Sequence, residues 1–356
     1  MNVVRFVCLS SAMIFAAAFA GCGSSGAPSP SVMPAGVAWP ASSDRHVTIS
    51  EFKDLPQDDH SYFPTALTVG PDGAIWVADD IDQDIGQSAI VRITPSGKRT
   101  NTYYFQNETS PSFEGIATGS DGALWLTDWG DGIIVRCTTQ GAITTFPVYG
   151  HGPYGITAGP DKALWFAAGN AIGRITTQGV ISFYTKGLAQ GSGVPGITSG
   201  PDGALWFTDQ SHDAVGRITV AGKITEFSKG MSSDAEPYSI AAGPDGALWF
   251  TEVAGRIGRV TTTGKITEYS RGISESEEPS GIAAGPDGAL WFTEYESYDS
   301  YLYRGSKIGR ITTAGKITEY AKNLAPKSQP TGITAGPDGN MWFVESTANK
   351  MGRVNL

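Results

Sequence analysis

Carboxylates recur in this chain at one fixed position, three residues after a tryptophan. Six copies carry a carboxylate there and the seventh carries Ala168; the six are Asp79, Asp128, Asp209, Glu252, Glu294 and Glu345. Carboxylates gathered at one end of a fold can ligate a metal ion or exchange protons with a substrate. We take Glu294 and Glu345 as candidate metal ligands, and Glu345 also as a candidate catalytic residue.

A structural role competes with this chemistry, because each copy also carries an arginine further along the chain. The arginines are Arg92, Arg136, Arg174, Arg217, Arg259, Arg310 and Arg353. If each lies on the strand beside its carboxylate, the two side chains can form a cross-strand ion pair. We expect such pairs for the set as a whole, with one or two carboxylates left for function.

A histidine and three tyrosines extend the candidate set. His151 shortly precedes an expected inner strand and is the second candidate for proton transfer. Tyr154, Tyr238 and Tyr295 are candidate ligand-binding residues, because an aromatic ring can stack on a cyclic ligand. Tyr295 belongs to an insertion at 294–307, which could instead only cover a neighbouring repeat.

One loop looks superficially like a calcium site. Asp80, Asp82 and Asp84 alternate before Gly86, but the glycine comes one place late for a calcium loop. Val91 stands where such a loop ends in glutamate. Calcium binding is therefore not favoured.

The candidates are positioned by a repeat whose core reads GPDGALWFTE at 243–252. Its tryptophans are Trp76, Trp125, Trp165, Trp206, Trp249, Trp291 and Trp342. Each unit reads as a small-residue strand, a Pro-Asp-Gly turn, an apolar strand, a third strand IGRITT and, after a T-x-G-K turn, a half-exposed fourth strand. Units of this kind, about 40–45 residues apart, are typical of β-propeller blades. The sequence predicts an all-β, seven-bladed β-propeller of four-stranded antiparallel blades.

The ends of the chain and the loop lengths refine this prediction. The last repeat stops at its third strand, 351–356, while 46–52 reads as an orphan fourth strand, so we expect that N-terminal strand to complete the last blade and close the ring. The Pro-Asp-Gly and T-x-G turns hardly vary and fall on one face. The other connections vary freely and fall on the opposite face, where we expect function.

The N-terminal segment predicts export. Residues 1–21 have the layout of a signal peptide, and their Ala-Gly ending before Cys22 resembles a bacterial lipobox, which predicts lipidation of Cys22. An ordinary signal peptide cleaved nearby is the alternative. Residues 22–45, with Gly, Ser, Pro and Ala, are expected to form a flexible tether and 46–356 the propeller. We expect an exported lipoprotein whose anchor holds it to a membrane of the bacterial cell envelope.

Charge and cysteine content limit the possible partners. The 356 residues carry a formal net charge of −10, which argues against nucleic acid and for cationic or neutral ligands, either a small molecule or a component of the envelope. Cys137 occupies a position held by isoleucine in other repeats, so a buried core thiol is expected. We expect a monomer, and the residues alone specify no cofactor.

The repeat P-x-G-I-T-x-G-P-D-G-x-L-W-F-T-E, followed by I-G-R-I-T-T-x-G-K-I-T-E-Y, resembles the streptogramin lyase, or virginiamycin B lyase, family over 46–356. The resemblance implies a Mg²⁺-dependent C–O lyase that opens cyclic depsipeptide antibiotics by elimination. It further implies two site histidines and two site glutamates. The histidine positions hold Ser280 and Thr331 here, Gln329 replaces the first glutamate, and Glu345 matches the second.

A hydroxyl is no base near neutral pH, and an amide is a weaker ligand for a hard cation than a carboxylate. We therefore predict a noncatalytic propeller that binds a ligand or partner, with Ser280, Gln329, Thr331 and Glu294 among its ligand-binding residues. One alternative is a C–O lyase acting on streptogramin B or a related cyclic or ester-containing compound, through a rearranged site around Glu345, Glu294 and His151. Another is a structural envelope protein whose acidic ring contacts peptidoglycan or a second protein.

Overall fold

The structure is a computed structural model, and it describes residues 47–53, 55, 62–81, 87–106, 112–275, 277–296, 305–325 and 327–356. The predicted signal peptide, Cys22 and the tether lie outside these residues, as do Asp82 and Asp84 of the first loop. Within the described part of the chain, no helix is long and apolar enough to cross a membrane.

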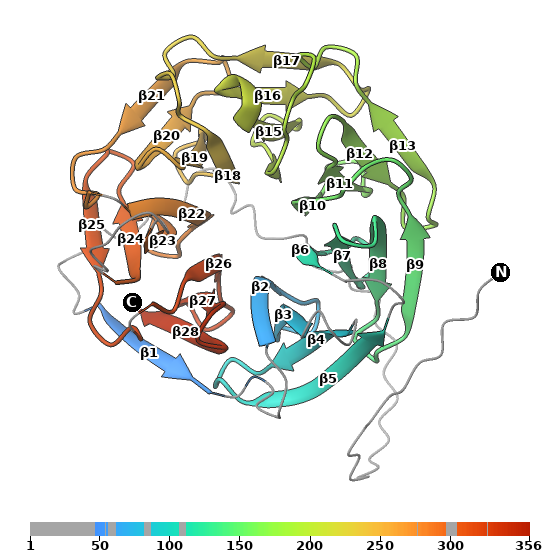
Figure 1. Ribbon diagram of the computed structural model, residues 1–356, viewed down its shortest axis with the longest axis vertical. Coiled ribbons are helices and arrows are strands. Elements are labelled where there is room, and N and C mark those ends of the chain that lie inside the picture. Colours follow the sequence, from blue (N-terminus) through green and yellow to red (C-terminus); the bar gives the residue numbers. More distant parts are fainter. Residues whose placement is uncertain are drawn as a thin grey trace, which may run out of the picture.

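The described strands form seven antiparallel sheets of four strands, arranged as blades around one axis (Figure 1). In chain order the first three blades are β2 (Tyr62–Val69), β3 (Ile75–Ile81), β4 (Gln87–Ile93) and β5 (Arg99–Gln106); β6 (Phe113–Thr118), β7 (Leu124–Asp128), β8 (Ile133–Cys137) and β9 (Ile143–Pro147); and β10 (Ile156–Ala158), β11 (Leu164–Ala167), β12 (Ile172–Ile175) and β13 (Ile181–Tyr184). Blades 4 and 5 are β14 (Ile197–Ser199), β15 (Leu205–Asp209), β16 (Ala214–Ile218) and β17 (Ile224–Phe227); and β18 (Pro237–Ala242), β19 (Leu248–Glu252), β20 (Arg256–Val260) and β21 (Ile266–Tyr269). Blades 6 and 7 are β22 (Glu277–Ala284), β23 (Leu290–Glu296), β24 (Lys307–Ile311) and β25 (Ile317–Tyr320); and β26 (Pro330–Ala335), β27 (Met341–Glu345), β28 (Lys350–Asn355) and β1 (Thr48–Phe52). The predicted fold class is confirmed.

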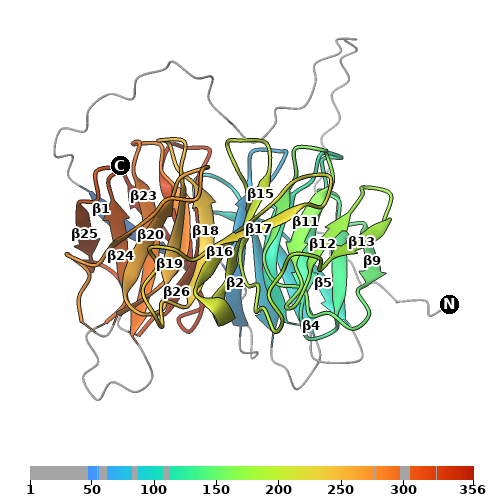
Figure 2. The same ribbon diagram turned by 90° about the horizontal axis from the view of Figure 1, so that it is seen from above.

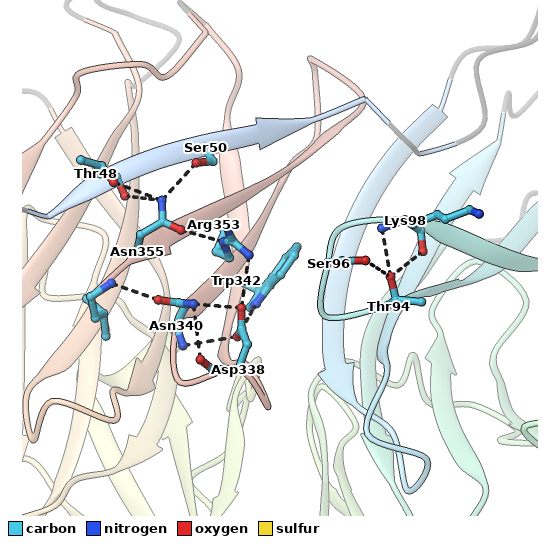
Figure 3. A network of polar contacts seen from close by, with 11 residues as sticks. Thr48, Ser50, Thr94, Ser96, Lys98, Asp338, Asn340, Trp342, Arg353 and Asn355 are labelled. Carbon is cyan, nitrogen blue, oxygen red and sulfur yellow. Dashed lines mark hydrogen bonds and ion pairs between the residues drawn. The ribbon is translucent and has the colours of Figure 1, made fainter.

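The N-terminal strand closes the ring, as predicted. β1 pairs antiparallel with β28, so that the two ends of the described chain share the seventh blade. The Asn355 amide donates hydrogen bonds to the Thr48 carbonyl at 3.2 Å and the Ser50 hydroxyl at 3.0 Å (Figure 3). Lys350 Nζ lies 2.7 Å from Glu51 Oε2. The clasp therefore leaves no unpaired edge on β28.

The tryptophans of the repeat form the cores between and within the blades. All seven are fully buried, and most stack on an aromatic residue of the blade's outermost strand, as Trp165 does on Tyr184 with ring centroids 5.3 Å apart. Close packing also fixes a glycine on each IGR-type third strand: a Cβ on Gly173 would lie 2.1 Å from the Phe166 ring. The apolar strands are thus covered on both faces, as their composition predicts.

The expected pairing of arginines with strand-end carboxylates is wrong. In blade 4, Arg217 lies opposite Trp206 in the strand register, three residues from Asp209, and its Nε binds Asp202 of the Pro-Asp-Gly turn at 2.6 Å. Asp202 also accepts a hydrogen bond from the Trp206 indole at 3.1 Å. The same three-residue unit recurs in every blade (Figure 3 shows the seventh), with Arg92, Arg136, Arg174, Arg217, Arg259, Arg310 and Arg353 bound to Asp72, Asp121, Asp161, Asp202, Asp245, Asp287 and Asp338. The arginines therefore stabilise the face of short turns and leave the carboxylates on the other face without them.

The two faces differ as the loop lengths predicted. The short turns, such as 70–74 and 94–98, close on their own backbone hydrogen bonds, with Gly70 N donating to Ala74 O at 2.8 Å. The other connections, which follow the second and fourth strands, form the opposite face (Figure 2 shows the ring edge-on). We call this opposite face the variable-loop face, and all candidate site residues in the described chain lie on it.

Candidate functional site

The strand-end carboxylates are buried where the second strand of each blade reaches the variable-loop face. In five blades the strand-end carboxylate lies opposite, in the strand register, the residue that precedes the first bulge of the inner strand, as Glu345 lies opposite Pro330. These carboxylates are Asp79, Asp128, Glu252, Glu294 and Glu345. All six carboxylates, Asp209 included, are 0% exposed. They do not form an open acidic ring at the surface, because the first strands cover them.

Basic side chains accompany these carboxylates in only some blades. In blades 5 to 7 the third strand places a cation opposite: Arg256, whose Nε lies 2.6 Å from Glu252 Oε2, Lys307 opposite Glu294, and Lys350 opposite Glu345. In blades 1 and 2 the opposite residues are Ala89 and Ile133. The charge around the ring is therefore asymmetric, with uncompensated carboxylates on the side of blades 1 and 2.

Burial raises the pKa of several of these groups. Desolvation, reinforced by the charges of Glu319 and Glu277, raises the pKa of Glu294 to about 9 although Lys307 opposes the shift. Desolvation raises the pKa of Glu345 to about 7, with Ser328 and Lys350 opposing it. Within the described part of the chain, neither oxygen of Glu294 has a hydrogen-bond partner. Both can hold a proton near neutral pH, but both are enclosed.

In six blades one residue stands between the proline (Phe113 in blade 2) and the Gly-Ile-type start of the inner strand, at the variable-loop end of the ring. We call these residues the rim positions; they are Thr65, Glu114, Tyr154, Tyr238, Ser280 and Thr331, and blade 4 has no counterpart because Pro195 is followed directly by Gly196 and Ile197. In blades 1, 2, 5, 6 and 7 a β-bulge shifts the register at this point, as between Pro330 and Ile333. A bulge re-aims the side chain it carries.

Hydrogen bonds hold the rim positions of blades 5 to 7 from blade to blade. The hydroxyls of Thr208, Thr251 and Thr293 donate to the carbonyls of Tyr238, Ser280 and Thr331 in the next blade, at 2.7, 2.8 and 2.6 Å. The threonine of the WFTE motif therefore fixes the rim of the following blade.

The two positions that match the family's histidines are built as structural residues. Thr331 Oγ1 donates to the Thr65 carbonyl at 3.1 Å and lies 2.9 Å from Ser346 Oγ, while Ser280 is only 7% exposed. Gln329 donates from its backbone amide to Ser306 and accepts at its carbonyl from the amide of Ser346. The Thr331 side chain thus joins blade 7 to blade 1, and Ser280 is buried in blade 6.

The residues present do not fit the Mg²⁺ site that the resemblance implies. Among the described residues, no group of three or more His, Cys, Asp or Glu side chains is placed to hold a metal ion. Glu345 offers an enclosed carboxylate that is partly protonated near pH 7. A hard divalent cation needs several charged oxygen ligands around one open point, and this set does not supply them.

The structure does not bring His151 together with Glu345. His151 lies in the connection between blades 2 and 3, stacks on Phe183 of the outermost strand of blade 3 at 4.3 Å, and places Nδ1 3.2 Å from Asn170 Oδ1. Glu345 belongs to blade 7, and no contact among the described residues joins the two. Tyr295 lies beyond Glu294 on β23, half-buried and opposite Glu278.

Sequence reasoning missed Glu114 and Trp129, which adjoin Tyr154. Glu114 occupies the rim position of blade 2, and Trp129 directly follows the strand-end Asp128, with its ring 6.2 Å from that of Tyr154. Aligning the repeats at the position before Gly-Ile would have revealed Glu114, since Phe113 there replaces the proline of most other repeats. Trp129 lies outside the repeat pattern and had no such signal.

An open cleft of about 470 Å³ lies beside Trp129 on the variable-loop face. It is lined by Trp129 and Asp131 from the connection after β7, and by Tyr149, His151 and Gly152 from the connection between blades 2 and 3. The cleft thus joins one candidate of the sequence, His151, to aromatic residues that continue toward Tyr154 and the rim.

Comparison with known proteins extends these observations. The model of the virginiamycin B lyase family matches residues 47–298 and 149–356. A streptogramin B lyase structure is 33% identical, with a TM-score of 0.73 and coverage of 87% of this chain and 98% of that one. A catalytically inactive histidine-to-alanine variant of virginiamycin B lyase from Staphylococcus aureus, crystallised with quinupristin, is 34% identical, with a TM-score of 0.74 and coverage of 87% and 99%.

A more distant likeness is to the extracellular domain of a hybrid two-component system protein from B. thetaiotaomicron. It is 14% identical, has a TM-score of 0.65 and covers 88% of this chain and 43% of that one, which supports the fold alone. A search of curated protein sequences gave no match. The blades, the repeat and the family match, which runs along almost the whole described propeller, all agree. The chain therefore belongs to the virginiamycin B lyase family.

Proposed function

We propose that this protein binds a small cyclic or ester-containing ligand on the variable-loop face and does not open it. The observation that carries the proposal is the state of positions 280 and 331, where the family resemblance implies histidines. Ser280 is buried and the Thr331 hydroxyl is engaged with Thr65 and Ser346. Neither residue can remove a proton near neutral pH.

Elimination next to a carbonyl needs a base for the proton and a positive group for the developing enolate. Here Gln329 replaces one carboxylate, and Glu345 is enclosed. The Staphylococcus aureus relative supports the separation of binding from chemistry, because replacing one histidine made that enzyme inactive and it still crystallised with quinupristin. Loss of histidines in this chain is compatible with a propeller that keeps a ligand site.

The test follows binding and ring opening in the same samples. The purified protein is incubated with quinupristin and Mg²⁺, binding is measured by calorimetry, and ring opening is followed by mass spectrometry. We expect saturable binding with no ring opening above the rate in buffer. Mg²⁺-dependent turnover would overturn the noncatalytic proposal, and absence of binding would overturn the proposed ligand class.

A lyase with a rearranged site remains the second candidate, and one observation favours it. Burial raises the pKa of Glu345 to about 7, which suits a general base at neutral pH. If turnover is seen, Glu345→Gln should abolish it while Glu236→Gln, an exposed carboxylate of the same face, should not. If there is no turnover, the triple change Ser280→His, Thr331→His and Gln329→Glu is the smallest set expected to restore it.

We further infer that the protein is exported and held to a membrane by lipid on Cys22. The support is the sequence of 1–21 and the lipobox-like ending at Cys22, followed by a segment too poor in apolar residues to fold. An anchored propeller would present its variable-loop face to ligands of the envelope. Fractionation of a Cys22 variant tests this location, as described below.

A further inference from the structure

The cleft beside blade 2 contains aromatic side chains that are exposed yet fixed. Trp129 is 50% exposed and Tyr149 is 86% exposed, which is unusual for such large rings. The Trp129 amide donates to the Ser112 carbonyl at 2.9 Å, and its indole Cδ1 and Nε1 pack against Gly152, where a Cβ would lie 2.4 Å from each. Trp129 is therefore a rigid platform whose open face can stack on a flat ring.

The platform continues into the rim. Trp129 contacts Tyr154, and the next rim position is empty because Gly196 follows Pro195 directly in blade 4. A Cβ on Gly196 would lie only 2.4 Å from the carbonyl oxygen of Tyr238, so the backbones of blades 4 and 5 meet closely there. The rim therefore lacks one side chain between Tyr154 and Tyr238.

The rim position on the other side of Tyr154 carries a carboxylate. Glu114, at the rim position of blade 2, is half-buried and accepts a hydrogen bond from the Ser112 hydroxyl at 3.3 Å. Burial raises the pKa of Tyr154 and of Tyr238, and the negative charge of Glu114 raises both further. The pKa of Tyr238 reaches about 12. Glu114 and Tyr154 lie in neighbouring blades, where a Cβ on Gly115 would come 3.2 Å from the Tyr154 carbonyl oxygen, and Tyr238 lies two blades further around the ring.

The charge of this region favours a cation. Among the described residues, no lysine or arginine forms an ion pair with Asp79, Asp80, Glu114 or Asp128, whereas blades 5 to 7 carry Arg256, Lys307 and Lys350 at the equivalent place. Burial, together with the charge of Asp128, raises the pKa of Glu114 to about 7. A cationic ligand would restore its charge, whereas an anion would meet repulsion.

We propose that the cleft and the adjoining rim positions form one site for a small organic cation, a protonated amine attached to a flat ring. The ring stacks on Trp129, and the ammonium group lies between Tyr154 and Tyr238 and pairs with Glu114. Aromatic faces attract an ammonium group through their quadrupole, and a cleft of about 470 Å³ has the size of a small-molecule site. A bare metal ion does not suit this site, because a hard cation needs several charged oxygen ligands around one point, and the described residues place no group of three or more His, Cys, Asp or Glu side chains together. This inference rests on the proposed binding function and adds the chemical class and the subsite of the ligand.

Three probes of one shape and different charge test the inference. They are 2-phenylethylammonium, 2-phenylethanol and phenylacetate, titrated into the purified protein at pH 7.5 and low salt, with dissociation constants from ligand-observed NMR. We expect the ammonium to bind at least about tenfold more tightly than the alcohol, and the anion not to bind measurably. Equal affinity for the ammonium and the alcohol would overturn the proposal.

Variants then assign the two halves of the site. Glu114→Gln should remove the preference for the ammonium and leave the alcohol unchanged, while Trp129→Ala should weaken both and Trp129→Phe should restore part of the loss. Glu236→Gln, on the same face but between blades 4 and 5, is the matched control and should change neither. Thermal melting of each variant checks that the ring is intact, and unchanged preference in a folded Glu114→Gln protein would refute the role of Glu114.

The same variants separate this inference from the proposed function. If quinupristin binds the wild type, and binds Glu114→Gln and Trp129→Ala equally well, the subsite is wrong while the binding function stands. If the ammonium preference holds but quinupristin does not bind, the site stands and the proposed ligand class fails.

Discussion

The buried carboxylate Glu294 makes the stability of the propeller depend on pH in an unusual direction. It is 0% exposed, and neither of its oxygens has a hydrogen-bond partner among the residues that the structure describes. The cation opposite it in the strand register, Lys307, is already bound by Glu277 at 2.9 Å and Glu319 at 3.3 Å, so it compensates Glu294 only weakly. We predict that Glu294→Gln, which removes the titrating group and keeps the shape, stabilises the protein increasingly as pH rises.

The size of the effect follows from the two pKa values. Burial raises the pKa of Glu294 from the ordinary 4.5 to about 9 in the folded state. The folded protein therefore binds this proton more tightly than the unfolded chain, and the resulting stability is present at low pH and is lost as pH rises from about 4.5 toward 9. Between pH 5 and 8 the loss is roughly 1.4 kcal/mol per pH unit, or about 4 kcal/mol in all.

The assay compares the melting temperatures of wild type and variant at matched pH. For a ring of about 300 residues, about 4 kcal/mol corresponds to roughly 6 °C. The melting temperature of Glu294→Gln minus that of wild type should therefore rise by about 6 °C from pH 5 to pH 8. Using the difference cancels other titrating groups and any fixed cost of the new amide. A difference that is constant with pH, or that falls as pH rises, would refute the burial argument.

Three further predictions concern the ring and its location. Deleting β1 (Thr48–Phe52) should expose the edge of β28, so that the protein melts less cooperatively or self-associates in size-exclusion chromatography; an unchanged monomer would exclude the clasp as a stabilising element. Burial opposes ionisation of Asp202, but hydrogen bonds from Arg217 and Trp206 outweigh it and lower its pKa. The stability that ionised Asp202 contributes is thus present above about pH 4 and is lost in acid. In urea unfolding, Asp202→Asn should lower the free energy of unfolding by about 1–2 kcal/mol at pH 7 and by less at pH 3. In cells, Cys22→Ser should move the protein from the membrane fraction to the soluble one or stall its processing, and unaltered fractionation with a different mature N-terminus would rule out the anchor.

The sequence repeat alone was sufficient to predict the fold. Four apolar or alternating segments, separated by Pro-Asp-Gly and T-x-G-K turns, specify a four-stranded unit, because those turns reverse the chain tightly. Seven tryptophans at a blade-like spacing then specify seven blades, and 46–52 specifies the missing strand of the last one. Each of these features depends on residues close together in sequence, which is why local patterns sufficed.

The tertiary structure decided the electrostatics and the site. Strand register placed Arg217 opposite Trp206, so the arginine reached the turn residue Asp202 and not the strand-end Asp209. Three residues along a strand span about 10 Å. The sequence alone does not show which of two carboxylates at that separation the arginine side chain reaches.

The sequence also did not show which side chains meet across the ring. His151 and Glu345 fell on the same predicted face, but His151 precedes blade 3 and Glu345 belongs to blade 7, and no contact among the described residues joins them. Which side chains meet across the rim depends on the angular order of the blades and on burial by neighbouring strands. Local sequence determines the elements of a propeller, whereas its binding chemistry arises from contacts between residues that are tens to hundreds of positions apart.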